Sequence, residues 1–193
     1  MIPSEINRRL SKIVKCQILS DEYSRRFYSV DSSSYEIKPS VIVLPRNETE
    51  LRKIVKFASR NNISVTPRGA GTGLVGGALG KGIIVDMRYF NKIRVRKNFV
   101  NVQGGTLKGH LDIALSKHHR FLGPNPSVGP YCTLGGMIAT NASGKYSLKY
   151  GSTIDNLLQV RIMTSSGEII TLPSNHTKLK KIIKIIPDNI AKR

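Results

Sequence analysis

The chain has 193 residues, 39% of them hydrophobic and seventeen of them glycine, which suits one medium-sized or two small α/β or α+β domains. No run of about eighteen apolar residues occurs and the N-terminus lacks the apolar core of a signal peptide, which excludes a membrane-spanning helix and favours a cytoplasmic protein. A formal charge of +19 attracts nucleic acid, an acidic lipid surface or an anionic ligand.

An amphipathic helix and a polar segment open the chain. Apolar residues recur at helical spacing from Pro3 to Ile18, which predicts a helix that packs on the rest of the fold. Residues 20–38 are polar and irregular, with scattered aromatic side chains as candidate anchors. We expect an N-terminal helical segment over residues 1–35 and the main domain over residues 36–193.

The next segment predicts a β-α-β unit followed by one more strand. A buried-type strand at 41–44 precedes a helix whose start is marked by Asn47 and Glu50, the spacing of a capping box. Strands at 63–66 and 83–86 follow, and they enclose a glycine-rich loop. The later elements are two short strands, two helices, a hairpin and a basic helix, expected at 93–96, 99–103, 106–117, near Thr133, 157–172 and 176–186.

The loop from Thr66 to Gly82 is the most informative stretch. It holds seven glycines between Gly69 and Gly82, together with Arg68 and Lys81, and contains no acidic residue. Glycine adopts positive φ angles and lets the backbone approach a ligand closely. Successive exposed N–H groups form an anion-binding concavity. The sequence therefore predicts a phosphate-binding loop.

Two better-known phosphate motifs do not fit this loop. Gly71, Gly73 and Gly76 satisfy G-x-G-x-x-G, but a strand follows instead of a helix, and the residues about twenty positions further on are basic. The P-loop pattern fails because Val75 and Gly82 stand where it requires Gly and Ser or Thr.

Acidic residues avoid two long stretches, each of which contains a glycine-rich motif. No Asp or Glu occurs from Leu51 to Val85 or from Ile113 to Ile154. The second stretch contains Gly123–Ser127 and Cys132–Gly144, with uncharged hydrogen-bonding side chains that suit phosphate, ribose hydroxyls or the polar edge of a flavin. This distribution predicts two segments that face one strongly anionic ligand.

These motifs resemble those of the FAD-linked oxidases of the vanillyl-alcohol-oxidase type, and most closely the glycolate oxidase and D-lactate dehydrogenase branch. The resemblance rests on Pro67–Gly77, Val102–Gly105, Gly123–Ser127 and Cys132–Gly151, in order and with matching spacing. It implies an α+β, PCMH-type FAD-binding fold of two subdomains, a small β-α-β unit and a mixed or antiparallel sheet with helices. FAD would lie between the two subdomains.

The resemblance also implies which residues bind the cofactor. Residues 67–73 would wrap the FAD pyrophosphate, residues 126–133 would lie along the flavin and ribityl side, and a backbone group near Ile169 would touch the adenine. The implied cofactor-binding positions are Pro67, Arg68, Gly69, Ala70, Gly71, Thr72, Gly73, Leu74, Gly77, Pro126, Ser127, Cys132, Thr133, Gly135, Gly136, Thr140, Asn141, Ala142, Ser143, Gly144, Gly151 and Ile169.

A few individual residues indicate whether the flavin is covalently attached and whether a metal site is expected. Some relatives attach flavin through a His in an Arg-x-Gly-Gly-His motif; Thr72 holds that position here, so we expect non-covalent FAD. The two cysteines, Cys16 and Cys132, form neither a disulfide framework nor a Cys-x-x-Cys pattern, and no metal site is predicted.

The implied function is flavin-dependent oxidation of a 2-hydroxy acid similar to D-lactate or glycolate, with hydride passing to the flavin. The later cofactor motif and the substrate domain of the family do not appear, so no catalytic residue is named and we expect this chain alone to be inactive. A second chain is a candidate source of the substrate domain, and the basic surface allows peripheral membrane contact. Two alternatives stay open: a non-catalytic flavin-binding remnant or subunit, and a basic nucleic-acid-binding protein.

Overall fold

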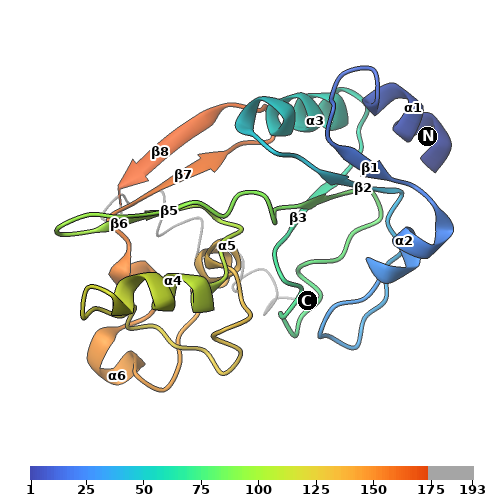
Figure 1. Ribbon diagram of the computed structural model, residues 1–193. Helices are drawn as coiled ribbons and strands as arrows, with labels where there is room; N and C mark the ends of the chain where they lie inside the picture. Colours follow the sequence, from blue (N-terminus) through green and yellow to red (C-terminus); the bar gives the residue numbers. More distant parts are fainter. Residues whose placement is uncertain (174–193) are drawn as a thin grey trace.

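The computed structural model describes residues 1–173, which form two lobes joined by short connections (Figure 1). The first lobe holds a four-stranded sheet with helices on both faces, and the second holds two small two-stranded sheets with three short helices. The mixed α+β class is therefore confirmed. The basic helix expected at 176–186 lies outside the described residues.

The sheet of the first lobe has the order β1-β2-β4-β3. Strands β2 (Val41–Leu44), β3 (Val65–Arg68) and β4 (Ile83–Asp86) are parallel, while β1 (Gln17–Leu19) runs antiparallel along β2. Helix α3 (Glu48–Arg60) connects β2 to β3. Because β4 lies between β2 and β3, β3 is an edge strand of the sheet. The glycine loop follows β3 and therefore leaves the sheet at this edge.

Both faces of the central strands are covered, which explains why β2 and β4 are almost entirely apolar. On one face, α1 (Pro3–Leu10) and α3 pack against Val41, Val43, Ile83 and Val85. On the opposite face, Ile42 and Ile84 pack with Tyr28, which follows α2 (Glu22–Phe27).

The second lobe surrounds its own apolar cluster. Strands β5 (Ile93–Val95) and β6 (Val100–Val102) form one hairpin, and β7 (Gln159–Met163) and β8 (Ile169–Pro173) form another. The β5–β6 hairpin packs with α4 (Lys108–Ser116) and α5 (Leu134–Ala139), which bury Leu111, Leu115, Leu134 and Met137. The remaining short helices are α6 (Ser147–Tyr150) and a 3₁₀ turn at Ile154–Asn156.

Three sequence-based expectations need correction. The helix predicted from Pro3 to Ile18 is wrong beyond Leu10. Ile18 lies in β1, where it pairs with Val43 of β2 and so gives the edge of β2 hydrogen-bond partners. The strand predicted at 63–66 lies at 65–68, where it is in register with β4. The segment 20–38, predicted to be irregular, contains α2. Asp21 caps the start of this helix by accepting a hydrogen bond from the Ser24 N–H at 2.8 Å.

The predicted start of α3 is confirmed with one difference in its hydrogen bonds. Asn47 Oδ1 accepts from the Glu50 N–H at 2.9 Å, as a cap requires. The Glu50 carboxylate accepts from the Arg46 N–H at 2.9 Å instead of from Asn47. Across residues 1–173, no helix has the length and apolar character needed to cross a membrane.

The packing of α1 gives a stability prediction. Leu10 is 0% exposed against the sheet, whereas Ile13 in the following turn is 37% exposed. We expect Leu10→Ala to lower the free energy of unfolding by about 2–5 kcal/mol because it leaves a cavity. Ile13→Ala is the matched control and should cost less than about 1 kcal/mol. Urea denaturation measures both, and equal losses would show that α1 does not cover the core.

Candidate functional site

The loop between β3 and β4 presents a row of backbone N–H groups. Gly71 and Gly76 take the positive φ angles of 69° and 71° that glycine adopts without strain. Within the described part of the chain, none of the N–H groups of residues 70–78 donates a hydrogen bond to a protein acceptor. Residues 69–70 and 73–75 are exposed to solvent. Exposed, unpaired N–H groups in succession are what an anion-binding loop offers.

The structure brings this loop against the start of α5. A Cβ added to Gly69 would lie 2.1 Å from Thr133 Oγ1, so the two segments touch at a distance that only glycine allows. Thr133 is also the N-cap of α5, and its Oγ1 accepts from the Gly136 N–H at 3.3 Å. The two glycine-rich, acid-free stretches therefore meet at one place.

The Gly104–Gly105 turn completes this junction. A Cβ on Gly105 would lie 1.9 Å from the carbonyl oxygen of Met87, the residue that follows β4. The Gly135 N–H donates to the Gly104 carbonyl at 2.7 Å, which ties the turn to α5. This turn is one of the motifs that support the family resemblance, but the sequence analysis does not include it among the residues of the site. Its closely spaced glycines were the signal that could have done so.

Other glycines of the loop face open space. A Cβ on Gly73 or Gly77 would meet no atom of residues 1–173 within 4 Å. The neighbouring side chains of Leu74 and Val75 are 75% and 72% exposed. This side of the loop is thus free to receive a ligand.

The segment 140–144 is held rigidly beside the run Gly123–Ser127. Gly144 has a φ of 154°, and a Cβ there would lie 2.0 Å from the Asn125 carbonyl oxygen. Asn141 adopts a positive φ, and its Oδ1 accepts from the Ile154 N–H at 2.9 Å. The Thr140 hydroxyl donates back to the Gly136 carbonyl at 2.9 Å.

Two hydroxyls of these segments stay available. The side chains of Ser127 and Ser143 belong to exposed residues and have no hydrogen-bond partner among the described residues. Pro126 contributes its carbonyl to a turn, where it accepts from the Gly129 N–H at 2.9 Å. Ala142 is tied down by the Thr153 hydroxyl, which donates to its carbonyl at 2.6 Å.

Several implied binding residues have their polar groups engaged within the protein. The Cys132 thiol is buried and donates to the Gly129 carbonyl at 3.3 Å, and burial raises its pKa. The N–H groups of Gly135 and Gly136 are both used in hydrogen bonds. Gly151, at φ 73°, packs against the Asp155 carboxylate. These residues shape the backbone around the site.

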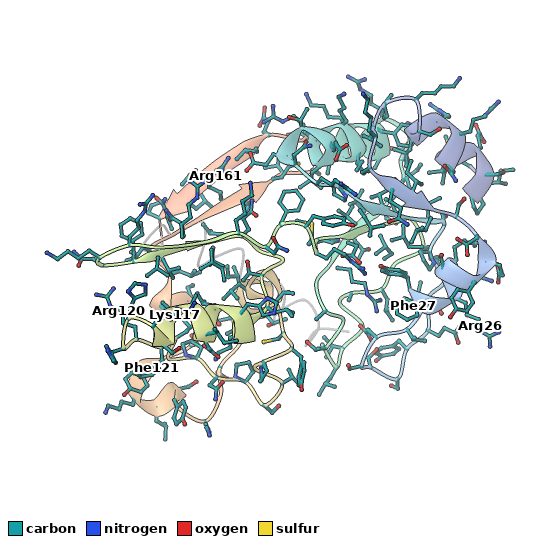
Figure 2. The ribbon with its side chains drawn as sticks, in the orientation of Figure 1. Arg26, Phe27, Lys117, Arg120, Phe121 and Arg161 are labelled. Carbon is teal, nitrogen blue, oxygen red and sulfur yellow. The ribbon has the colours of Figure 1, made fainter. Side chains whose placement is uncertain are left out.

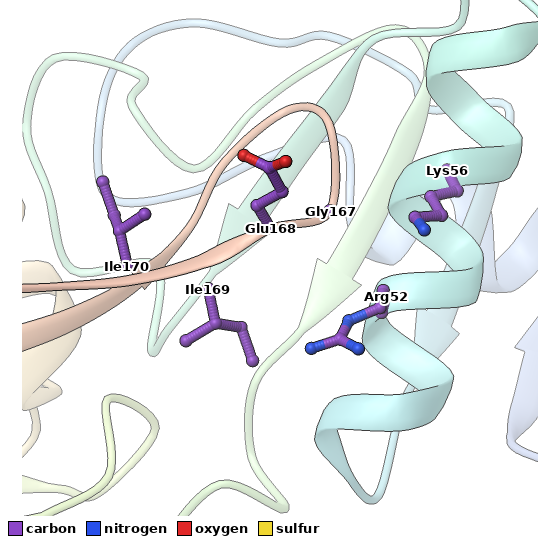
Figure 3. A pocket seen from close by; sticks show the side chains of 6 residues that line it. All are labelled: Arg52, Lys56, Gly167, Glu168, Ile169 and Ile170. Atoms are coloured by element: carbon purple, nitrogen blue, oxygen red, sulfur yellow. The ribbon is translucent and has the colours of Figure 1, made fainter.

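Ile169 lies in a different place from the other implied residues. It lines a cavity of about 360 Å³ between α3 and the β7–β8 hairpin, together with Arg52 and Lys56 (Figure 3). The hairpin is attached to α3 by a bidentate ion pair from Arg161 to Glu48, both contacts at 3.0 Å. The residues that line this cavity include no other implied cofactor-binding residue.

A larger cavity of about 670 Å³ lies between α4 and the segment 145–150. Phe121, one of its walls, makes an edge contact with the Tyr150 ring at 5.1 Å between centroids. Figure 2 shows Phe121 near Lys117 and Arg120 at the end of the second lobe. None of the implied cofactor-binding residues lines this cavity.

A polar network built on the buried side chains of Tyr28 and Asp86 lies at the base of the glycine loop. The Tyr28 hydroxyl donates to Asp86 Oδ2 at 2.6 Å, and Arg88 donates to the same oxygen at 2.7 Å. Burial opposes ionisation of Asp86, but the hydrogen bonds from Arg88 and Tyr28 outweigh it and hold the pKa of this carboxyl below its ordinary value. Burial and the contact with Asp86 raise the pKa of Tyr28 to about 12. Sequence reasoning missed this network; the signal was an acidic residue that ends a buried strand.

Comparison with known proteins decides the family. The family model described as "FAD binding domain" matches residues 39–173. The chain belongs to this FAD-binding family. FAD as the cofactor and the PCMH-type fold, which the resemblance implied, are therefore confirmed. Groups of three or more His, Cys, Asp or Glu that could hold a metal are absent from the described part of this family member.

Named relatives and one solved structure agree with this assignment. The family member is 40% identical over 149 residues to D-2-hydroxyglutarate dehydrogenase of Escherichia coli K12, which covers 74% of this chain and 15% of that protein. It is 36% identical over 148 residues to glycolate oxidase subunit GlcD of the same organism, covering 74% and 30%. The structure of an alkyldihydroxyacetonephosphate synthase superposes with a TM-score of 0.80 at 27% identity, covering 93% and 40%. The chain thus spans less than half the length of each.

The contact between Gly69 and Thr133 gives a second prediction. We expect Gly69→Ala to destabilise the protein by about 1–3 kcal/mol, because the added Cβ overlaps Thr133 Oγ1. Gly104→Ala is the control, since its Cβ would meet Gly135 at an ordinary 3.5 Å. Urea denaturation measures the free energy of unfolding of both variants, and the loss should be larger for Gly69→Ala than for Gly104→Ala.

A double variant separates the clash from other effects of alanine. In a Thr133→Ala background the overlapping oxygen is gone, so Gly69→Ala should cost less there than in the wild type. Additive losses would argue against direct contact between the two segments.

Proposed function

We propose that this chain is the FAD-binding part of a flavin-dependent oxidoreductase that oxidises a small 2-hydroxy acid similar to glycolate or D-lactate. The observation that carries the proposal is the row of N–H groups over residues 70–78 that have no acceptor within residues 1–173, joined to α5 by the Gly69–Thr133 contact. The named activities of the relatives, D-2-hydroxyglutarate dehydrogenase and glycolate oxidase, supply the substrate class.

The residues present fit the cofactor. The free N–H groups of the loop suit the negatively charged pyrophosphate, and Gly73 and Gly77 leave room for its close approach. Ser127, Asn141 and Ser143 offer neutral hydrogen-bonding groups to the ribityl hydroxyls or the polar edge of the flavin ring. When bound, FAD supplies the hydride acceptor for oxidation of the hydroxyl-bearing carbon.

The groups that bind the substrate come, in this proposal, from a further part of the enzyme. The relatives are several times longer than the matched region, and the glycolate oxidase relative is named as a subunit. We assign to this chain the binding and orientation of the flavin, and to a further segment or a second chain the catalytic base and the carboxylate-binding residues. The proposed location is the cytoplasm, with the basic surface available for peripheral contact with an acidic membrane.

The flavin is held without a covalent bond in this proposal. Thr72 stands where flavin-linking relatives carry histidine, and a threonine hydroxyl is a much weaker nucleophile than an imidazole. The thiol of Cys132 is buried and its pKa is raised, so it is poorly suited to form a bond with flavin.

The proposal predicts the behaviour of the purified chain. Incubated with FAD and passed through a desalting column, it should retain a flavin absorbance spectrum. Precipitation with acid should leave all the flavin in the supernatant. Protein that stays colourless after incubation would refute FAD binding, and flavin in the precipitate would refute non-covalent attachment.

Turnover assays with glycolate or D-lactate and an artificial electron acceptor test the division of labour. We expect no turnover from this chain alone and turnover once the part that binds substrate is supplied. A complemented complex that binds flavin but turns over neither acid would favour a non-catalytic flavin-binding module.

Gly73 provides a sharper test of where FAD binds. We expect Gly73→Ala to leave the stability of the flavin-free protein unchanged within about 0.5 kcal/mol, since its Cβ meets no atom of the described residues within 4 Å. The same Cβ would protrude toward the cofactor and weaken FAD binding about tenfold. Fluorescence titration with FAD measures the affinity. An unchanged affinity would place the cofactor elsewhere.

A further inference from the structure

The side chain of Arg68 points away from the ligand side of the glycine loop. Arg68 ends β3 and is only 9% exposed. Its guanidinium donates to the Val30 carbonyl at 2.8 Å and to the Tyr28 carbonyl at 3.3 Å, and it stacks on the Tyr28 ring at 5.2 Å. Because two of its donors serve protein carbonyls and the side chain is almost buried, this arginine is held within the protein and is not presented to a ligand on the surface of the loop.

The segment that Arg68 holds also contacts the loop itself. The Ser32 N–H and hydroxyl both donate to the Gly71 carbonyl, at 2.9 and 3.1 Å. The Tyr35 ring lies against Gly76, so that a Cβ there would come 3.0 Å from the ring. Gly71 and Gly76 are the two residues of the loop with positive φ, and each is contacted by residues 28–35.

Gly71 also makes room for the guanidinium. A Cβ on Gly71 would lie 2.8 Å from an Arg68 terminal nitrogen, so the arginine fills the space under the turn. The other end of the segment is fixed to the sheet, because Tyr28 is 5% exposed and donates to Asp86 at the end of β4. Residues 28–35 thus connect the two strands that flank the loop to the two turns within it.

From these contacts we propose that residues 28–35 and Arg68 form a latch that holds the glycine loop in the conformation that binds FAD, with Arg68 as a positioning residue and not a phosphate ligand. Residues 28–35 of the latch lie outside the region that the family model matches, which begins at residue 39, whereas Arg68 lies within it. The inference rests on the proposed binding of FAD at this loop.

The test compares Arg68→Lys with Arg94→Lys. Lysine keeps the positive charge at position 68 but cannot reach two carbonyls with a rigid fork of donors. Arg94, exposed on β5, is the control for the same substitution elsewhere. Two quantities are measured on the full 193-residue chain: the FAD affinity by fluorescence titration, and the hydrogen exchange rate of the Ser32 amide in the flavin-free protein by NMR.

The expected result is a joint change. Arg68→Lys should weaken FAD binding about tenfold and accelerate exchange of the Ser32 amide by a similar factor, whereas Arg94→Lys changes neither. Ser32→Ala, which removes one of the two bonds to Gly71, should give a smaller change in the same direction. The losses of FAD affinity in the double variant Arg68→Lys/Ser32→Ala should be less than additive, because both act through one loop conformation.

Other outcomes overturn the latch. Weaker FAD binding with unchanged Ser32 exchange would make Arg68 a direct phosphate ligand, and no change in either quantity would remove it from the site. If Arg68→Lys does not fold, the same two quantities are measured on Ser32→Ala and Tyr35→Ala. If neither variant changes the FAD affinity or the amide exchange rate at position 32, the latch is refuted. If the unaltered protein takes up no FAD, the proposed function fails, while exchange at Ser32 still shows whether Arg68 holds the segment on the loop.

Discussion

The close approach of backbones at glycine residues is the constraint on which the rest of this structure depends. At Gly69, Gly105 and Gly144 a single methyl group would come within about 2 Å of a neighbouring oxygen. Gly69 lets the glycine loop approach Thr133, Gly105 lets its turn approach Met87, and Gly144 lets the segment 140–144 approach Asn125. The contact at Gly69 helps to give the N–H groups of the loop a defined direction, together with the contacts that residues 28–35 make at Gly71 and Gly76.

The local elements were largely predictable because they follow from periodicity and capping. The strands at 41–44 and 83–86 are apolar apart from the terminal Asp86, since both faces of the sheet are covered. The first helix was predicted too long because Ile18 satisfies helical spacing as well as it does its actual strand pairing. Whether Ile18 lies in a helix or in a strand depends on its pairing with β2. The sequence pattern around Ile18 carries no information about where β2 lies.

The site was predictable as a set of motifs but not as a set of roles. Glycine content and the absence of acidic residues located the loop and the segment around Thr133. The sequence does not show which polar groups are already occupied. The motif assigns Arg68 to the cofactor, and the structure adds that its guanidinium donates to the carbonyls of Tyr28 and Val30. The Cys132 thiol and the Gly135 N–H likewise donate to protein carbonyls. The Arg68 contacts join residues about forty positions apart, and a motif read along the chain does not contain them.

The position of β1 has a consequence for anyone who trims the gene to the family boundary at residue 39. Such a shortened protein would lose β1 and leave one side of Val41–Leu44 without hydrogen-bond partners. An apolar strand with a bare edge readily adds strands from other molecules. The trimmed domain would therefore be prone to aggregate, and its insolubility could be mistaken for an intrinsic property of the flavin-binding fold.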